Sequence, residues 1–222
     1  MELNQFIDHT LLKPTATADQ IEVLCQEALT YDFFSVCVNS CYVSQAKELL
    51  KNTNIKICTV VGFPLGAMST VAKVQETKQA LADGAHEIDM VINLGFLRGG
   101  VFDAVRNDIQ SVKTIMPDQT LKIILETCYL TEDEIVKASE LAIEAGADFI
   151  KTSTGFGTGG ATTHAVKLMK KAIANRKVGI KASGGIRDTE TALQYINLGV
   201  QRIGTSNGIN IVTGKPSIEN NY

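Results

Sequence analysis

The chain has 222 residues, 45% of them hydrophobic and 20% charged, which is ordinary for a folded globular protein. The formal net charge of −3 gives no reason to expect a nucleic acid or an anionic membrane as partner. The first residues lack the cationic flank and apolar run of a signal peptide, and no apolar stretch approaches the roughly 20 residues that span a bilayer.

Short runs rich in β-branched residues alternate with amphipathic stretches of helical period along the chain. We expect strands at residues 7–11, 34–38, 56–61, 87–92, 121–126, 148–152, 178–182 and 201–204. We expect helices at residues 17–31, 43–51, 69–82, 101–115, 131–145, 162–174 and 188–198. Eight strands that alternate with helices predict an α/β fold, a parallel sheet closed into a (β/α)8 TIM barrel. An open doubly wound sheet is the alternative, but its Gly-x-Gly-x-x-Gly turn is absent after the first strand.

No linker or low-complexity segment interrupts this alternation. We therefore predict one barrel domain over residues 1–213 and a polar tail over residues 214–222. The five scattered cysteines favour free thiols in a reducing cytoplasm over a disulfide framework. A weak internal repeat, in which a glycine ends a helix shortly before a strand, places Asp89 and Lys151 at matching positions. These two side chains should therefore face the same way in the sheet.

Two lysines, Lys151 and Lys181, each close a short apolar strand and precede a turn that contains glycine. An ammonium group is costly to bury unless something compensates its charge. We interpret one amine as a nucleophile and the other as a cation that lowers its pKa. In a TIM barrel the reactive groups gather at the carboxyl ends of the strands, so Asp89 and Glu126 should join the two lysines. Nearby hydroxyls come from Thr152, Ser153 and Thr154.

A neutral Lys151 amine can form a Schiff base with a carbonyl compound, and the resulting iminium is an electron sink for breaking a carbon–carbon bond. Asp89 can hold a water molecule and move protons during these steps. This chemistry needs no metal and no other cofactor. The three histidines form no His-x-x-x-His pair, which disfavours a zinc-dependent aldolase. For either lysine taken alone, a solvated residue at a strand end is the competing interpretation.

Turns that contain glycine also follow the seventh and eighth predicted strands, at residues 183–187 and 204–208. In TIM barrels the loops after these two strands commonly bind phosphate through backbone amides at helix N-termini. Arg187 could add a charge-assisted contact, and Gly155 extends the flexible rim. Together the turns predict a phosphorylated substrate.

Four strings of residues together resemble the deoxyribose-phosphate aldolases, which are class I aldolases. They are Ile-Asp-His-Thr-Leu-Leu-Lys-Pro at 7–14, Glu-Ile-Asp-Met-Val-Ile-Asn at 87–93, Phe-Ile-Lys-Thr-Ser-Thr-Gly at 149–155 and Lys-Ala-Ser-Gly-Gly-Ile-Arg at 181–187. The resemblance runs from the first predicted strand to about Gly208. It implies a TIM barrel that reversibly cleaves 2-deoxy-D-ribose 5-phosphate to D-glyceraldehyde 3-phosphate and acetaldehyde.

The resemblance also implies roles for individual residues. Lys151 matches the Schiff-base lysine, Lys181 the second lysine that perturbs it, and Asp89 the acid/base aspartate. The positions matching the family's phosphate site are Gly155, Gly184, Gly185, Arg187, Gly204 and Ser206. The positions matching its substrate pocket are Asp8, Thr10 and Cys37, beside the hydroxyl of Thr152. Phe156 and Asn207 differ from the residues of some members, and Tyr222 matches a terminal tyrosine that reaches the active site in some members.

Two other functions compete with this interpretation. Another aldolase or a transaldolase-like enzyme would keep the Schiff base but use a different aldehyde donor. A barrel that binds sugar phosphates without catalysis would form no covalent adduct. We expect a small phosphorylated sugar and acetaldehyde as partners, no nucleic acid or membrane, and a homo-oligomer, with a homodimer through the outer helices as the default.

Overall fold

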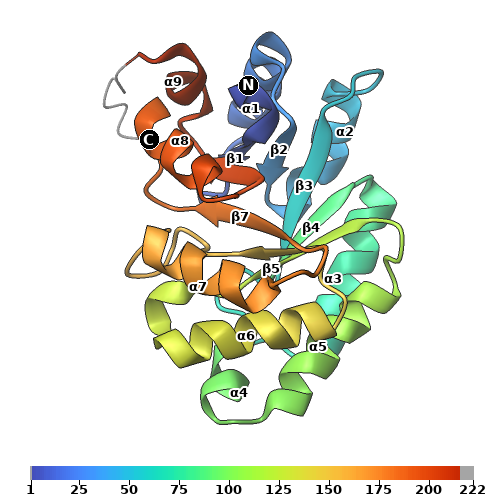
Figure 1. The fold of residues 1–222 in the computed structure, drawn as a ribbon. Helices are drawn as coiled ribbons and strands as arrows, with labels where there is room; N and C mark the ends of the chain where they lie inside the picture. The colour runs from blue at the N-terminus through green and yellow to red at the C-terminus, as the bar shows by residue number, and fades with distance from the viewer. Residues whose placement is uncertain (1, 216–222) are drawn as a thin grey trace.

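Eight parallel strands form a closed barrel with helices around it (Figure 1). The structure, a computed structural model, describes residues 2–215. The strands are β1 (Ile7–Leu11), β2 (Ser35–Val38), β3 (Lys56–Val61), β4 (Glu87–Val91), β5 (Thr120–Ile124), β6 (Phe149–Lys151), β7 (Gly179–Ser183) and β8 (Arg202–Thr205). Each strand pairs with the next one along the chain, and β8 pairs with β1 to close the ring. The predicted TIM barrel is confirmed.

Helices follow the strands around the outside of the barrel. They are α1 (Ala18–Tyr31), α2 (Val43–Leu49), α3 (Thr70–Asp83), α4 (Leu94–Arg98), α5 (Phe102–Thr114), α6 (Glu132–Glu144), α7 (Thr163–Ile173), α8 (Thr189–Asn197) and α9 (Gly208–Thr213). Short 3-10 helices are η1 (Leu3–Phe6), η2 (Ser40–Tyr42) and η3 (Thr127–Tyr129). Sequence periodicity missed the short helices α4 and α9, because one or two turns carry too few residues to establish a period. Among the described residues, no helix is both long and apolar enough to cross a membrane.

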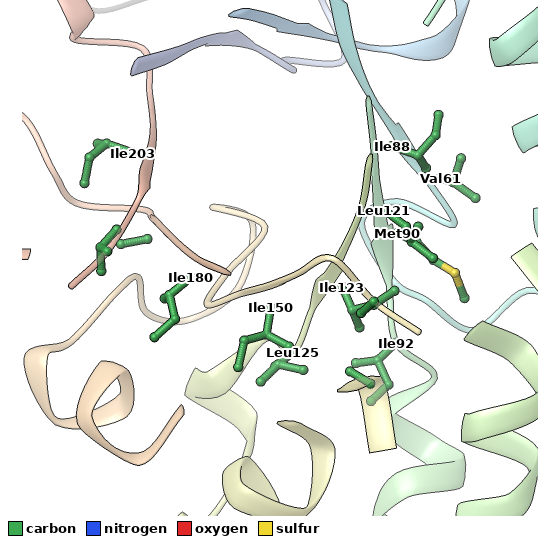
Figure 2. Packing of buried hydrophobic residues seen from close by; sticks show 14 of the residues in the cluster. Val61, Ile88, Met90, Ile92, Leu121, Ile123, Leu125, Ile150, Ile180 and Ile203 are labelled. Carbon is green, nitrogen blue, oxygen red and sulfur yellow. The ribbon is translucent and has the colours of Figure 1, made fainter. Parts of the chain in front are cut away.

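Apolar side chains on the outer face of the strands pack against the helices and form the main core. Ile88 and Met90 of β4, Leu121 and Ile123 of β5, and Ile150 of β6 belong to this layer (Figure 2). Successive side chains of a strand point to opposite faces, so the residues between them point into the barrel. The inward faces of β1 and of β4 to β8 therefore carry the charged residues that make the site.

Two predicted segments, the fifth strand and the tail, end or begin close to the limits of what the structure describes or forms. The strand predicted over 121–126 ends at Ile124, because Glu126 has a left-handed backbone with φ of 53° and cannot continue the pleat. The predicted tail begins at residue 214, and only Gly214 and Lys215 of it lie within the described residues. Tyr222, the predicted terminal contact to the site, lies outside them.

Candidate active site

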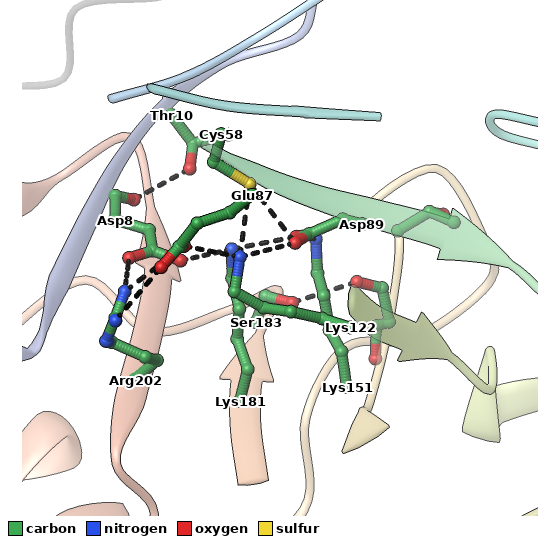
Figure 3. Close-up of polar contacts among 12 residues, drawn as sticks. Asp8, Thr10, Cys58, Glu87, Asp89, Lys122, Lys151, Lys181, Ser183 and Arg202 are labelled. Carbon is green, nitrogen blue, oxygen red and sulfur yellow. Dashed lines mark hydrogen bonds and ion pairs between the residues drawn. The ribbon is translucent and has the colours of Figure 1, made fainter. Parts of the chain in front are cut away.

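Charged side chains from six strands meet inside the barrel (Figure 3). They are Asp8 of β1, Glu87 and Asp89 of β4, Lys122 of β5, Lys151 of β6, Lys181 of β7 and Arg202 of β8. The strand register aligns them, since Asp89 is opposite Lys122, and Lys181 is opposite both Lys151 and Arg202. All are buried. We call these seven residues the charged cluster.

Asp89 is the centre of the charged cluster. Its Oδ2 accepts hydrogen bonds from Lys151 Nζ at 2.7 Å and from Lys181 Nζ at 2.8 Å. Its Oδ1 accepts one from Lys122 Nζ at 2.8 Å and one from the Cys58 thiol at 3.1 Å. Lys151 and Lys181 therefore share one carboxylate oxygen, and the sequence prediction that they lie together beside Asp89 agrees with this geometry.

The other two carboxylates of the charged cluster each bridge two cations. Asp8 contacts Lys181 Nζ at 2.5 Å and Arg202 at 2.8 Å. Glu87 contacts Lys122 Nζ at 2.6 Å and Arg202 at 3.3 Å. Lys122, Lys181 and Arg202 thus have two carboxylate partners each. Among residues 2–215, Lys151 has a single carboxylate partner, Asp89.

These contacts set the protonation states of the charged cluster. Burial alone would raise the pKa of Asp89, but Lys122, Lys151 and Lys181 outweigh it and hold that pKa well below its usual range. For Lys181, burial favours the neutral amine, but Asp8 and Asp89 outweigh it and raise the pKa above its ordinary value. For Lys122, burial again favours the neutral amine, but Asp89 and Glu87 outweigh it and raise the pKa of Lys122 above its ordinary value. Asp89 is therefore ionised, and Lys122 and Lys181 are charged, at neutral pH.

Two thiols lie beside the charged cluster. Cys37 of β2 and Cys58 of β3 are opposite each other in the register, and both are buried. A hydrogen bond with Cys58 lowers the pKa of the Cys37 thiol, whereas burial raises the pKa of the Cys58 thiol. These sulfurs lie within 4.8 Å of each other and of an Asp89 oxygen, a spacing that a metal ion could use. The lysines already hold Asp89, so a metal ion there would have to compete with them.

Residues predicted to line the pocket occupy distinct places. Asp8 and Thr10 face the inside of the barrel, whereas His9 points outward to Glu27 of α1, with Nε2 2.7 Å from the carboxylate. The sequence had left open which of these two faces was inward. The Thr152 hydroxyl accepts from Ser183 N and donates to Ser183 O, so it links the ends of β6 and β7. Glu126 is buried but contacts Thr154 and not the charged cluster.

The predicted phosphate residues divide into two groups. The exposed or half-buried ones at the carboxyl ends of the strands are Gly155, Gly184, Gly185, Arg187 and Ser206. Gly204 differs, because it is buried within β8. A Cβ at Gly204 would come within 3.0 Å of Lys181 Cε, so this glycine makes room for the lysine.

Sequence reasoning missed the contributions of Lys122, Glu87, Arg202 and Cys58. A period-two count along β4 and β5 does place Glu87 beside Asp89, and Lys122 on the same face as Glu126, so a signal for both existed. Nothing in the sequence near Arg202 indicated that it belongs to the site. Its partner Asp8 is at the other end of the chain, and only the closure of β8 on β1 brings them together.

Comparisons with known proteins point in one direction. The sequence model of one family, described as DeoC/LacD family aldolase, matches residues 3–212. A deoxyribose-phosphate aldolase of Brevibacillus brevis is 53% identical over the full length of both chains. One from Finegoldia magna is 56% identical over 96% of this chain and 100% of its own. A solved structure, a deoxyribose phosphate aldolase from Aeropyrum pernix described as tetrameric, superposes with a TM-score of 0.89 at 30% identity, covering 96% of this chain and 90% of its own.

Proposed function

Because the chain belongs to the DeoC/LacD family of aldolases, and within it to the deoxyribose-phosphate aldolases, we propose that it cleaves 2-deoxy-D-ribose 5-phosphate through a Schiff base on Lys151. The products are D-glyceraldehyde 3-phosphate and acetaldehyde, and the reaction is reversible. The observation that carries the choice of Lys151 is the pairing within the charged cluster, since the other three cations have two carboxylate partners each.

The charge count of the cluster supports this choice. Four cations face three carboxylates, so a fully ionised cluster has one uncompensated positive charge. An unpaired buried charge is costly, and Lys151 is the cation of the cluster with only one carboxylate partner. Lys151 is also the most accessible of the three lysines, with 3% of its side chain exposed against 0% for Lys122 and Lys181. The amine with the fewest carboxylate partners is therefore also the one that a substrate reaches most easily.

The reaction then follows from the position of the amine. Lys151 Nζ attacks C1 of the open-chain sugar, and the carbinolamine loses water to give an iminium. Removal of the proton from the C3 hydroxyl breaks the C2–C3 bond and releases D-glyceraldehyde 3-phosphate. The electron pair remains on C2 as an enamine. Protonation of C2 and addition of water release acetaldehyde and regenerate the Lys151 amine.

Asp89 can serve as the proton carrier of these steps because its proton affinity depends on Lys151. The cationic Lys151 is one of three ammonium groups that hold the pKa of Asp89 low. The nitrogen of Lys151 is uncharged in the carbinolamine and in the enamine, so at these two stages Asp89 loses one of those three cations. Its affinity for a proton rises at the stages in which protons must move. Lys181, on the same carboxylate oxygen, keeps the carboxylate in place.

The anionic end of the substrate fits the exposed turns after β6, β7 and β8. These turns contain Gly155, Gly184, Gly185, Arg187 and Ser206. Their exposed backbone amides and the Arg187 guanidinium are the donors that phosphate oxygens accept from. The homodimer and the cytoplasmic location expected from the sequence stay predictions.

Trapping with sodium borohydride and acetaldehyde tests the proposal. We expect one ethyl group on Lys151, located by mass spectrometry of peptides, because borohydride reduces the iminium to a stable secondary amine. The Lys151→Ala variant should take up no ethyl group and lose cleavage activity by several orders of magnitude. Lys171→Ala, which removes an exposed lysine of α7, is the matched control and should behave as the unmodified chain. Full activity in Lys151→Ala would refute the assignment.

A further inference from the structure

Glu126 is a buried carboxylate in an unusual backbone conformation. It lies between β5 and η3 with φ of 53° and ψ of 62°, a left-handed conformation that residues other than glycine, asparagine and aspartate seldom adopt. Only 2% of the residue is exposed. Strain of this kind persists where the surroundings fix it, and it is concentrated at functional sites.

The contacts of Glu126 explain why this conformation is held. Both carboxylate oxygens accept from Thr154 N, at 3.1 and 3.3 Å, and the Thr154 hydroxyl donates to Oε2. The residues on either side of Glu126 bind the same segment, with Leu125 N donating to Lys151 O and Thr127 N donating to Thr152 O. Among residues 2–215, no cation forms an ion pair with Glu126. The carboxyl group is therefore held by the loop that follows β6.

That loop, residues 154–160, is fastened at both ends. At its far end Ala161 N donates to Ser183 O and Gly184 O, and Gly160 and Gly184 approach so closely that a Cβ at Gly184 would lie 2.8 Å from Gly160 Cα. At its near end the loop depends on Glu126. A Cβ at Gly157 would lie 3.2 Å from Glu126 Cδ, so the middle of the loop also packs on this carboxyl group.

We infer that Glu126 is a positioning residue that holds the loop 154–160 against the turn after β7 and thereby sets the affinity for the anionic end of the substrate. The inference rests on the proposed function, because it assigns the exposed amides of these two turns to phosphate. Glu126 touches neither Lys151 nor Asp89. It therefore acts on binding of the phosphorylated end and not on the formation of the Schiff base.

Kinetics with two substrates test the inference. In Glu126→Ala we expect KM for 2-deoxy-D-ribose 5-phosphate to rise about tenfold, because the loop loses its hydrogen bonds from Thr154 to Glu126 and no longer holds the phosphate donors in place. The catalytic efficiency toward unphosphorylated 2-deoxy-D-ribose should change less than about threefold, because that sugar does not use the turns. Glu126→Gln keeps an oxygen acceptor for Thr154 N, so its KM for the phosphorylated sugar should lie between that of the unmodified chain and that of Glu126→Ala. Adduct formation with acetaldehyde should match that of the unmodified chain.

Thr131→Ala separates a positioning role from loss of stability. It removes the N-terminal cap of the neighbouring helix α6 and should lower the melting temperature of the protein while KM stays the same. An unchanged KM in Glu126→Ala, or an equal loss with both sugars, would overturn the inference. If Glu126→Ala does not fold, Glu126→Gln and Thr154→Val decide by the same comparison.

Binding of inorganic phosphate, measured by calorimetry, tests the inference without turnover. We expect weaker binding in Glu126→Ala than in the unmodified chain, and equal binding would count against the inference. Absence of the borohydride adduct in the unmodified chain would instead refute the proposed function, so the two failures are distinguishable.

Discussion

The charged residues of the candidate site share a small number of oppositely charged partners. Asp89 serves three lysines, and Asp8 and Glu87 serve two cations each. Removal of one member of such a buried network leaves the others uncompensated. The effect of a substitution should therefore depend on the number of partners left without a counter-ion. That number is largest for Asp89.

Asp89→Asn is the sharpest test at this scale. The amide keeps the shape of the side chain but leaves Lys122, Lys151 and Lys181 without their shared anion. We expect cleavage activity to fall by about two to four orders of magnitude, the usual contribution of a general acid or base. Steady-state kinetics would measure the loss. Asp103→Asn, at an exposed carboxylate of α5, is the control and should retain full activity. Comparable activities in the two variants would contradict the central position of Asp89.

The sequence predicted Lys151, Lys181 and Asp89 as neighbours because each is at a strand end or on a matching repeat position. It could not predict how many carboxylate partners each lysine has. That distinction depends on Asp8, which pairs with Lys181 and not with Lys151, and this contact exists only in the closed barrel.

At the scale of elements, buried polar contacts outside the barrel fix how the helices sit on the strands. Lys73 of α3 and Asp108 of α5 form a buried ion pair at 2.5 Å. Lys73 Nζ also donates to Val91 O at 3.0 Å, at the end of the strand that carries Asp89. This pair joins two helices to β4 from behind the site.

Lys73→Met should therefore destabilise the fold by about 3 to 5 kcal/mol, because Asp108 would be left as a buried charge without a cation. Chemical denaturation would measure the change. The double variant Lys73→Met, Asp108→Leu should recover most of the loss, since it removes both charges together. Lys51→Met breaks an exposed pair with Glu48 and should cost at most about 1 kcal/mol. Equal losses of stability in Lys73→Met and Lys51→Met would show that burial does not strengthen the dependence of the fold on the Lys73–Asp108 pair.

Element prediction from sequence worked where the pattern is local and failed where it is not. Short runs rich in β-branched and other apolar residues marked all eight strands, although the inward face of several strands carries charged residues. The end of β5 was misplaced by two residues. Nothing in the identity of Glu126 signals a left-handed backbone, which follows from its contact with Thr154 in another unit.

At the scale of the whole molecule, the charged cluster makes stability depend on pH at both extremes. Asp8 and Asp89 have pKa values below 3.8, their ordinary value, so the folded chain binds fewer protons than the unfolded chain in acid. Lys122 and Lys181 have pKa values above 10.5, their ordinary value, so the folded chain holds more protons in alkali. The contribution of the cluster is therefore complete between these two limits. It decreases as the pH falls below 3.8 and as it rises above 10.5.

Comparison of the unmodified chain with Asp8→Asn isolates this effect. The difference in the free energy of unfolding should be constant near neutrality and shrink as the pH falls below 3.8, because the unfolded Asp8 then takes up a proton that the folded one does not. Denaturant titrations at a series of pH values would measure it. A difference that persisted unchanged far into acid would contradict the low pKa of Asp8.

The order of charges along the chain has a consequence for synthesis on the ribosome. The three carboxylates of the cluster lie on β1 and β4, and the four cations lie on β5 to β8. The amino-terminal half of the nascent chain thus emerges with only the anions, and the carboxyl-terminal half supplies every counter-ion. Neither half can bury its inner face alone without a severe electrostatic cost. We therefore expect the charged cluster to gain its full set of ion pairs only when β8, the last strand, pairs with β1.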